Sequence, residues 1–171
     1  MSNKELVTFA SLISAGLIKS VDYIPCCDDI MLKEDSPSQL IMDLSLLKDE
    51  EAAVKRLLSE AYGNIEESYP LPGTGYFEVC AMFLMYKSGE IGWEYFLRSA
   101  INIAEHGICQ WGANDFNRFL KAYLESGCRE KLAKNQSEQL AGVFKEEIEE
   151  IRIYQTMIEK RNLTSFSKGR S

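Results

Sequence analysis

The sequence predicts an all-α protein, a single-domain bundle of about seven helices whose short loops permit stacked helical hairpins. Apolar residues recur every three or four positions along most of the chain, and the alternation typical of strands is almost absent. Its 171 residues, 46% hydrophobic and 26% charged, fit one folded domain. We expect this domain at residues 1–162, followed by a flexible C-terminal tail at residues 163–171.

The first helix is expected at residues 4–18, where Leu6, Phe9 and Ile13 belong to one apolar stripe. Residues 20–35 are expected to form a long connection, with room for a short extended or helical piece at Asp29–Lys33. The later helices are expected at residues 37–47, 50–62, 76–89, 90–107, 114–127 and 137–160. The Pro/Gly-rich loop GNIEESYPLPGTG, before the helix expected at residues 76–89, is the best candidate for a hinge between the two halves.

Charge is unevenly distributed along the chain. Residues 1–85 carry 14 Asp and Glu against 6 Lys and Arg, a balance of −8, whereas residues 86–171 carry 12 against 13, a balance of +1. An acidic half repels a phosphate backbone, so we expect no nucleic-acid partner. The same half attracts basic proteins and speeds their encounter.

Several features predict a cytoplasmic protein that does not bind a membrane. The longest apolar run near the start is too short to span a bilayer, and no secretory signal is evident. The cysteines are odd in number and lie in helical-looking segments, unlike a secreted disulfide framework.

The stretch PCCDDIMLKED, from Pro25 to Asp35, raises the question of a metal site or a reactive thiol. Adjacent Cys26 and Cys27 are poorly spaced for one zinc ion, and His106 is the only imidazole available as a base. No phosphate-binding loop or nucleophile elbow is present in the sequence. We therefore predict no enzyme activity, no metal and no cofactor.

The same stretch begins a series of carboxylates that continues into the following segments. We expect these groups to share one face and to bind a basic partner around an apolar centre. The predicted partner-binding residues are the acidic Asp28, Asp29, Glu34, Asp35, Asp49, Glu50, Glu51, Glu66 and Glu67, and the apolar Ile30, Met31 and Tyr69.

The segment YIPCCDDIMLKEDSPSQLIMDLSLL resembles a stretch that recurs in small helical bacterial proteins. Some of these are regarded as immunity proteins of toxin–immunity pairs, including contact-dependent inhibition systems. The resemblance covers about 25 of the 171 residues. It implies a cytoplasmic protein that binds one toxin domain, commonly a basic nuclease, and blocks its active site. It transfers no binding residues, because such pairs diverge where they touch.

Three functions follow from these observations. The first is an immunity or inhibitor protein that neutralises a cognate basic toxin domain through its acidic surface. The second is a helical adaptor or regulatory module that binds a protein or peptide. The third is an enzyme with a divalent metal bound by carboxylates, which requires at least three such groups within reach of one ion.

Overall fold

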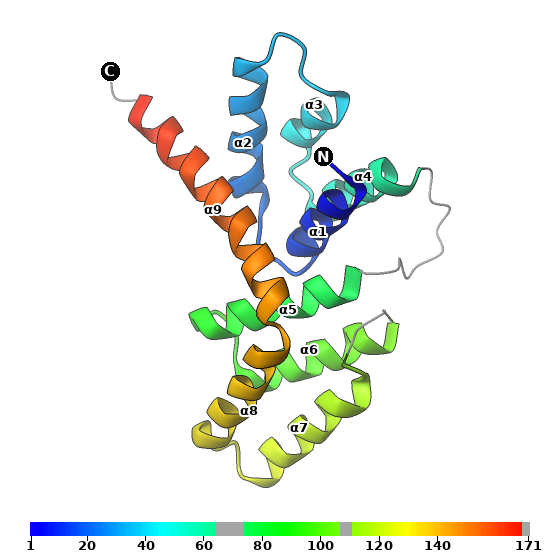
Figure 1. Ribbon diagram of the computed structural model, residues 1–171, viewed down its shortest axis with the longest axis vertical. Helices are drawn as coiled ribbons and strands as arrows, with labels where there is room; N and C mark the ends of the chain where they lie inside the picture. The colour runs from blue at the N-terminus through cyan, green and yellow to red at the C-terminus, as the bar shows by residue number, and fades with distance from the viewer. Residues whose placement is uncertain (64–73, 107–110, 169–171) are drawn as a thin grey trace. The chain divides into compact units, whose positions relative to one another are not determined.

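The computed structural model describes residues 1–63, 74–106 and 111–168 (Figure 1). Every regular element in these ranges is a helix, which confirms the all-α class. The described ranges hold nine helices, so the expected number of about seven was too low. They are α1 (Asn3–Ser14), α2 (Ser20–Lys33), α3 (Gln39–Leu46), α4 (Glu50–Tyr62), α5 (Thr74–Ser88), α6 (Trp93–His106), α7 (Ala113–Glu125), α8 (Glu130–Val143) and α9 (Lys145–Lys168).

The chain divides into two compact units. Unit 1 consists of Met1–Ser68 and Ile151–Ser171, and unit 2 consists of Tyr69–Glu150, so the division falls inside α9. The proposal of one domain at residues 1–162 with a flexible tail stays a prediction. Within the described ranges, no helix is long and apolar enough to cross a membrane.

Unit 1 is built on the pair α1 and α4, which pack closely along their apolar stripes. The Ser2 hydroxyl accepts a hydrogen bond from the Glu5 N–H, and the Glu5 carboxylate accepts one from the Ser2 N–H, so α1 begins with a capping box. At the other end of the pair, Gly63 has a φ of +82° and ends α4, as its sequence predicts.

Helix α2 occupies the segment that was expected to be a connection with at most a short extended or helical piece at Asp29–Lys33, and this expectation was wrong. Its N-terminus is fixed by the Asp22 carboxylate, which accepts a hydrogen bond from the Lys19 N–H at 2.9 Å. Tyr23, Cys26 and Cys27 are buried at helical spacing. Pro25 lies inside the helix, where it supplies no N–H for the carbonyl of Val21, a residue that is itself exposed.

Unit 2 is organised around aromatic side chains from α5, α6, α7 and the α8–α9 junction. The ring centroids of Phe83 and Phe96 are 5.6 Å apart, and those of Phe96 and Phe116 are 6.4 Å apart. Phe144 extends the cluster at 5.6 Å from Phe83. These rings are fully or almost fully buried, so unit 2 has a continuous aromatic core.

The chain between residues 130 and 168 forms two helices where the sequence suggested one helix over 137–160. Phe144 separates α8 from α9 and has φ −89° and ψ 11°, outside the regular helical values. Its side chain is completely buried. Because the apolar seam continues through Phe144, periodicity alone does not reveal the break.

Candidate functional site

The predicted partner-binding residues fall into two groups in the structure. Asp28, Asp29, Ile30, Met31, Glu34 and Asp35 lie in the C-terminal half of α2 and directly after it. Asp49, Glu50 and Glu51 lie at the start of α4. Glu66, Glu67 and Tyr69 lie outside the described residues.

The carboxylates at the start of α4 bind groups of their own chain. Asp49 caps the helix, because its carboxylate accepts hydrogen bonds from the N–H groups of Glu51 at 2.9 Å and Ala52 at 3.4 Å. Glu51 forms an exposed ion pair with Lys55 at 2.8 Å. These interactions give two of the predicted binding residues a structural role.

Glu50 holds the beginning of α2. The N–H of Ser20 donates to the Glu50 carboxylate at 3.0 Å, and this hydrogen bond is the main reason why the pKa of Glu50 is lowered. The carboxylate thus supplies an acceptor to one of the N–H groups that a helix start leaves without a partner. Glu50 is therefore a cross-element cap rather than a free charge.

The two groups lie at opposite ends of α2. Glu50 contacts Ser20 at the N-terminal end, whereas Glu34 follows the last helical residue. With a rise of 1.5 Å per residue, these ends are about 20 Å apart. The structure therefore separates the predicted residues into two clusters instead of one continuous patch.

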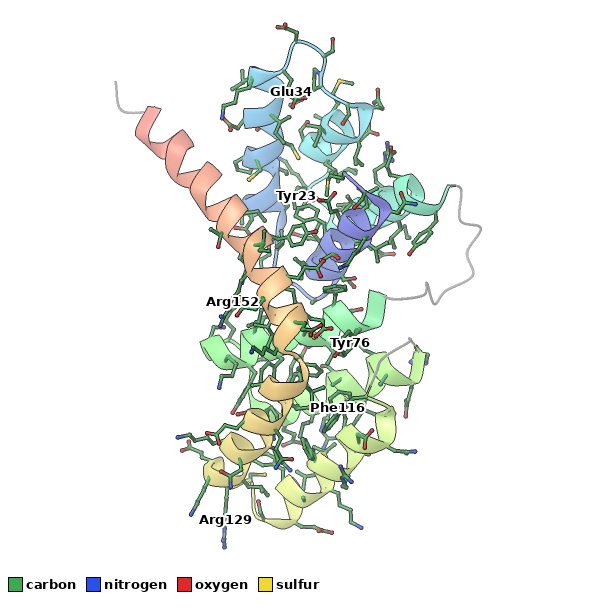
Figure 2. The ribbon with its side chains drawn as sticks, in the orientation of Figure 1. Tyr23, Glu34, Tyr76, Phe116, Arg129 and Arg152 are labelled. Carbon is green, nitrogen blue, oxygen red and sulfur yellow. The ribbon has the colours of Figure 1, made fainter. Side chains whose placement is uncertain are left out.

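The acidic end of α2 holds carboxylates that have no partner. Asp29 is paired with Lys33, one turn further along the helix. The carboxylates of Asp28, Glu34 and Asp35 form no hydrogen bond or ion pair with any residue that the structure describes. Figure 2 shows Glu34 where the chain leaves α2 and turns toward α3.

Glu34 and Asp35 lie directly after the C-terminus of α2, which is the unfavourable end for a carboxylate, whereas Asp28 lies before the last turn. The C-terminus of a helix carries a partial negative charge, so nearby carboxylates destabilise it and nearby cations stabilise it. Lys33 is the single basic residue in the last turn of α2, and it already pairs with Asp29. A cationic partner would relieve this local excess of negative charge.

The apolar residues predicted for the centre are only partly accessible. Ile30 and Met31 have intermediate exposure, and the Met31 Sδ lies 3.8 Å from the Ser45 hydroxyl in α3. The structure instead exposes Leu32 to 87% and Val21 to 74%. The sequence did not indicate that either residue is exposed, because the segment of α2 was not expected to be one helix.

We call Val21, Pro25, Asp28 and Leu32 the outer face of α2. They follow one another at spacings of four, three and four residues, which places them on one side of the helix. The buried Tyr23, together with the two cysteines, lies on the opposite side. The outer face thus combines apolar side chains with one unpaired carboxylate.

The cysteines of α2 belong to the core of unit 1. Cys26 and Cys27 are both buried, and the Cys26 thiol donates to the Asp22 carbonyl oxygen at 3.3 Å. No three His, Cys, Asp or Glu side chains gather closely enough to hold a metal ion in the part of the chain that the structure describes. The carboxylate–metal alternative therefore has no candidate cluster there.

His106 is the last residue of α6. Its Nδ1 lies 2.8 Å from the Asn102 carbonyl oxygen, one turn earlier, so the ring satisfies a carbonyl near the helix end.

Comparison with known proteins adds no assignment: no protein-family model, no curated protein and no solved structure matches this chain.

Proposed function

We propose that this protein is an inhibitor of the immunity type, which binds a basic toxin domain, a nuclease, and blocks its activity. The observation that carries the proposal is the group of unpaired carboxylates at the C-terminal end of α2, beside exposed Leu32. The binding residues are Asp28, Glu34 and Asp35.

Electrostatics supports a cationic macromolecule at this end of α2. The unpaired carboxylates add to the negative end of the helix dipole, which is unfavourable in the free protein. Lys or Arg groups of a partner would offset that cost and form charge-assisted hydrogen bonds. Long-range attraction would also raise the association rate, which matters for a protein that must neutralise a toxin quickly.

The same surface explains how binding would inhibit a nuclease. A nuclease holds its substrate through Lys and Arg contacts to phosphates. Carboxylates that pair with those groups occupy the sites that the nucleic acid needs. The protein requires no catalytic group for this action, and exposed Leu32 supplies an apolar contact beside the acids.

The gene next to this one provides the direct test. We expect it to encode a protein whose C-terminal domain arrests growth when expressed alone, and growth should return when the present chain is co-expressed. Stopped-flow fluorescence then measures association of the two purified proteins. The triple variant D28N/E34Q/D35N should slow association by about ten-fold at low ionic strength, with a smaller effect at high salt.

A second triple variant controls for total charge. Glu105, Glu138 and Glu146 are exposed in unit 2 and unpaired within the described ranges. E105Q/E138Q/E146Q removes three negative charges from −7 and leaves −4, as the first variant does. Equal slowing by both triples would show that net charge acts instead of this surface. A neighbouring product that is neither toxic nor bound would contradict the proposed function.

A further inference from the structure

We infer that the outer face of α2 receives a single helix of the partner, laid along it with its cationic end beside Glu34 and Asp35. This inference rests on the proposed function and adds which element the partner presents. The observations that carry it are the exposed apolar side chains Val21 and Leu32 and the position of the unpaired acids.

The outer face has the form of a helix-binding stripe. Val21, Pro25 and Leu32 lie on one side of α2, and the stripe extends about 16 Å along the helix axis, or three turns. An amphipathic helix presents its anchors at the same spacing of three and four residues. Two such stripes can interdigitate along their lengths, as ridges into grooves.

The charges along the stripe give the bound helix a direction. At the Val21 end, the carboxylates of Asp22 and Glu50 already accept hydrogen bonds from the N–H groups of Lys19 and Ser20. At the Leu32 end, Glu34 and Asp35 are unpaired within the described structure. A partner helix is therefore held with its Lys or Arg residues beside Leu32.

Two other occupants fit the surface less well. A strand cannot extend α2, because a helix satisfies its backbone groups internally and offers no open edge. A second copy of this chain brings a further net charge of −7 to an acidic surface, which opposes association. A basic amphipathic helix is complementary in both shape and charge.

Binding of a synthetic peptide to the 171-residue chain tests the inference. The probe is a fluorescent helical peptide of about 18 residues, with leucines at three- and four-residue spacing and lysines near one end. Fluorescence anisotropy at low salt should show saturable binding. L32S should weaken it by about ten-fold, whereas L46S should not, because Leu46 is 82% exposed on α3 and is absent from the outer face.

The direction of binding is tested with two further peptides. Each carries a photoreactive residue, at the lysine end in one and at the opposite end in the other. Mass spectrometry should map the first cross-link to residues 28–35 and the second to residues 19–22. A peptide with glutamate in place of lysine should not bind, and D28N/E34Q/D35N should weaken binding of the lysine peptide.

Several results would overturn the inference. The first is a lack of saturable peptide binding, and the second is an equal loss of peptide affinity in L32S and L46S. The third is a dimer in analytical ultracentrifugation that L32S abolishes, because it would show that a second copy of the chain binds the outer face. If the peptide fails while the neighbouring gene's domain still binds through the acidic end of α2, the helix inference falls and the proposed function stands. If the peptide binds and that domain does not, the toxin-inhibitor function falls.

Discussion

The two units of this protein are stabilised in different ways. In unit 2, the rings of Phe83, Phe96 and Phe116 form a continuous buried cluster. Among its buried polar residues, Gln136 has both ends of its side-chain amide hydrogen-bonded: the oxygen accepts from the Trp93 Nε1–H at 2.8 Å, and the NH₂ donates to the Phe119 carbonyl at 3.0 Å. Helices α6, α7 and α8 are thereby joined.

Unit 1 has an aliphatic core and polar links near its surface. The Tyr23 hydroxyl donates to the Leu47 carbonyl oxygen, which ties α2 to the chain after α3. The Arg56 Nε donates to the Asp43 carboxylate at 2.7 Å, which joins α3 to α4 and is the main cause of the lowered pKa of Asp43. These links lie away from the outer face of α2, which stays exposed at Val21, Asp28 and Leu32.

The units also differ in what they expose. Among the described residues, large apolar side chains at the surface of unit 1 are Met1, Val21, Leu32, Leu46, Tyr62 and Ile153, and those of unit 2 are Tyr95 and Leu124. Exposed apolar groups beside unpaired charges are typical of a binding surface, and a closed aromatic core is typical of a scaffold. The difference supports placing partner binding in unit 1.

The largest expected effect separates the cores of the two units. Phe96→Ala removes a fully buried ring from unit 2 and should lower the free energy of unfolding by about 3–5 kcal/mol. Both tryptophans, Trp93 and Trp111, lie in unit 2, so their fluorescence in urea reports that unit, whereas circular dichroism reports the helices of both. We expect the fluorescence transition to shift more than the dichroism transition.

Leu57→Ala is the matched change in unit 1, because Leu57 is also fully buried. It should cost about 2–5 kcal/mol and mainly shift the dichroism transition. If either variant shifts the fluorescence and dichroism transitions equally, the two units unfold together. The units would then differ in how their cores are packed but not in their free energies of unfolding.

A second prediction concerns a buried side-chain amide of unit 2, that of Gln136. Gln136→Leu keeps the volume similar but leaves the Trp93 Nε1–H buried without an acceptor, which should cost about 1–3 kcal/mol. Urea unfolding followed by tryptophan fluorescence measures the loss. Gln139→Leu is the control, since Gln139 is exposed on the same helix and unpaired within the described ranges. Equal effects would mean that the hydrogen bond contributes nothing specific.

The sequence predicts the helices best where apolar spacing and capping residues agree. The expected helix at residues 50–62 is α4, with Asp49 as its cap and Gly63 at its end. Periodicity alone was insufficient elsewhere. The segment of α2 was expected to be a connection, although Tyr23 and Cys26 keep helical spacing. Phe144 continues the apolar seam across the break between α8 and α9.

The candidate site was harder to predict, because sequence cannot show which charges are already paired. Asp49 and Glu50 belong to a run of acidic residues and were therefore predicted to bind a partner. In the fold their carboxylates cap helices. Glu50 finds its partner Ser20 thirty residues away, which no local pattern indicates. The exposure of Leu32 follows from the helical conformation of α2, which the sequence did not predict.

A third prediction concerns a buried hydroxyl in unit 1. Thr8 is fully buried in α1, and its Oγ1 has no hydrogen-bond partner among the residues that the structure describes, in contrast to Gln136 of unit 2. Thr8→Val removes the hydroxyl with little change in shape and should raise the free energy of unfolding by about 1 kcal/mol. Urea unfolding followed by circular dichroism measures the gain.

Ser11 provides the control for this change. It is also buried in α1, but its hydroxyl donates to the Val7 carbonyl oxygen at 2.9 Å. Ser11→Ala should therefore be neutral or slightly destabilising. If Thr8→Val destabilises the protein, the Thr8 hydroxyl has a partner in solution, and the contrast between the two units in buried polar groups would disappear.

The smallest expected effect tests the surface links of unit 1 through their pH dependence. The Ser20 N–H lowers the pKa of Glu50 in the folded protein relative to the unfolded chain. The ionised carboxylate therefore stabilises the fold above the unfolded pKa, and this contribution is lost as the pH falls through the folded value. Stability should decline below about pH 4, and Glu50→Gln should make that decline shallower.

Urea unfolding at a series of pH values measures this slope. Glu51→Gln is the control, because Glu51 lies in the same first turn of α4 but pairs with exposed Lys55, an interaction of little energetic value. A slope that changes equally in both variants would mean that the decline reflects total charge. In that case the Glu50–Ser20 hydrogen bond would not stabilise the contact between α2 and α4. The position of α2 in unit 1 would then depend on the aliphatic core.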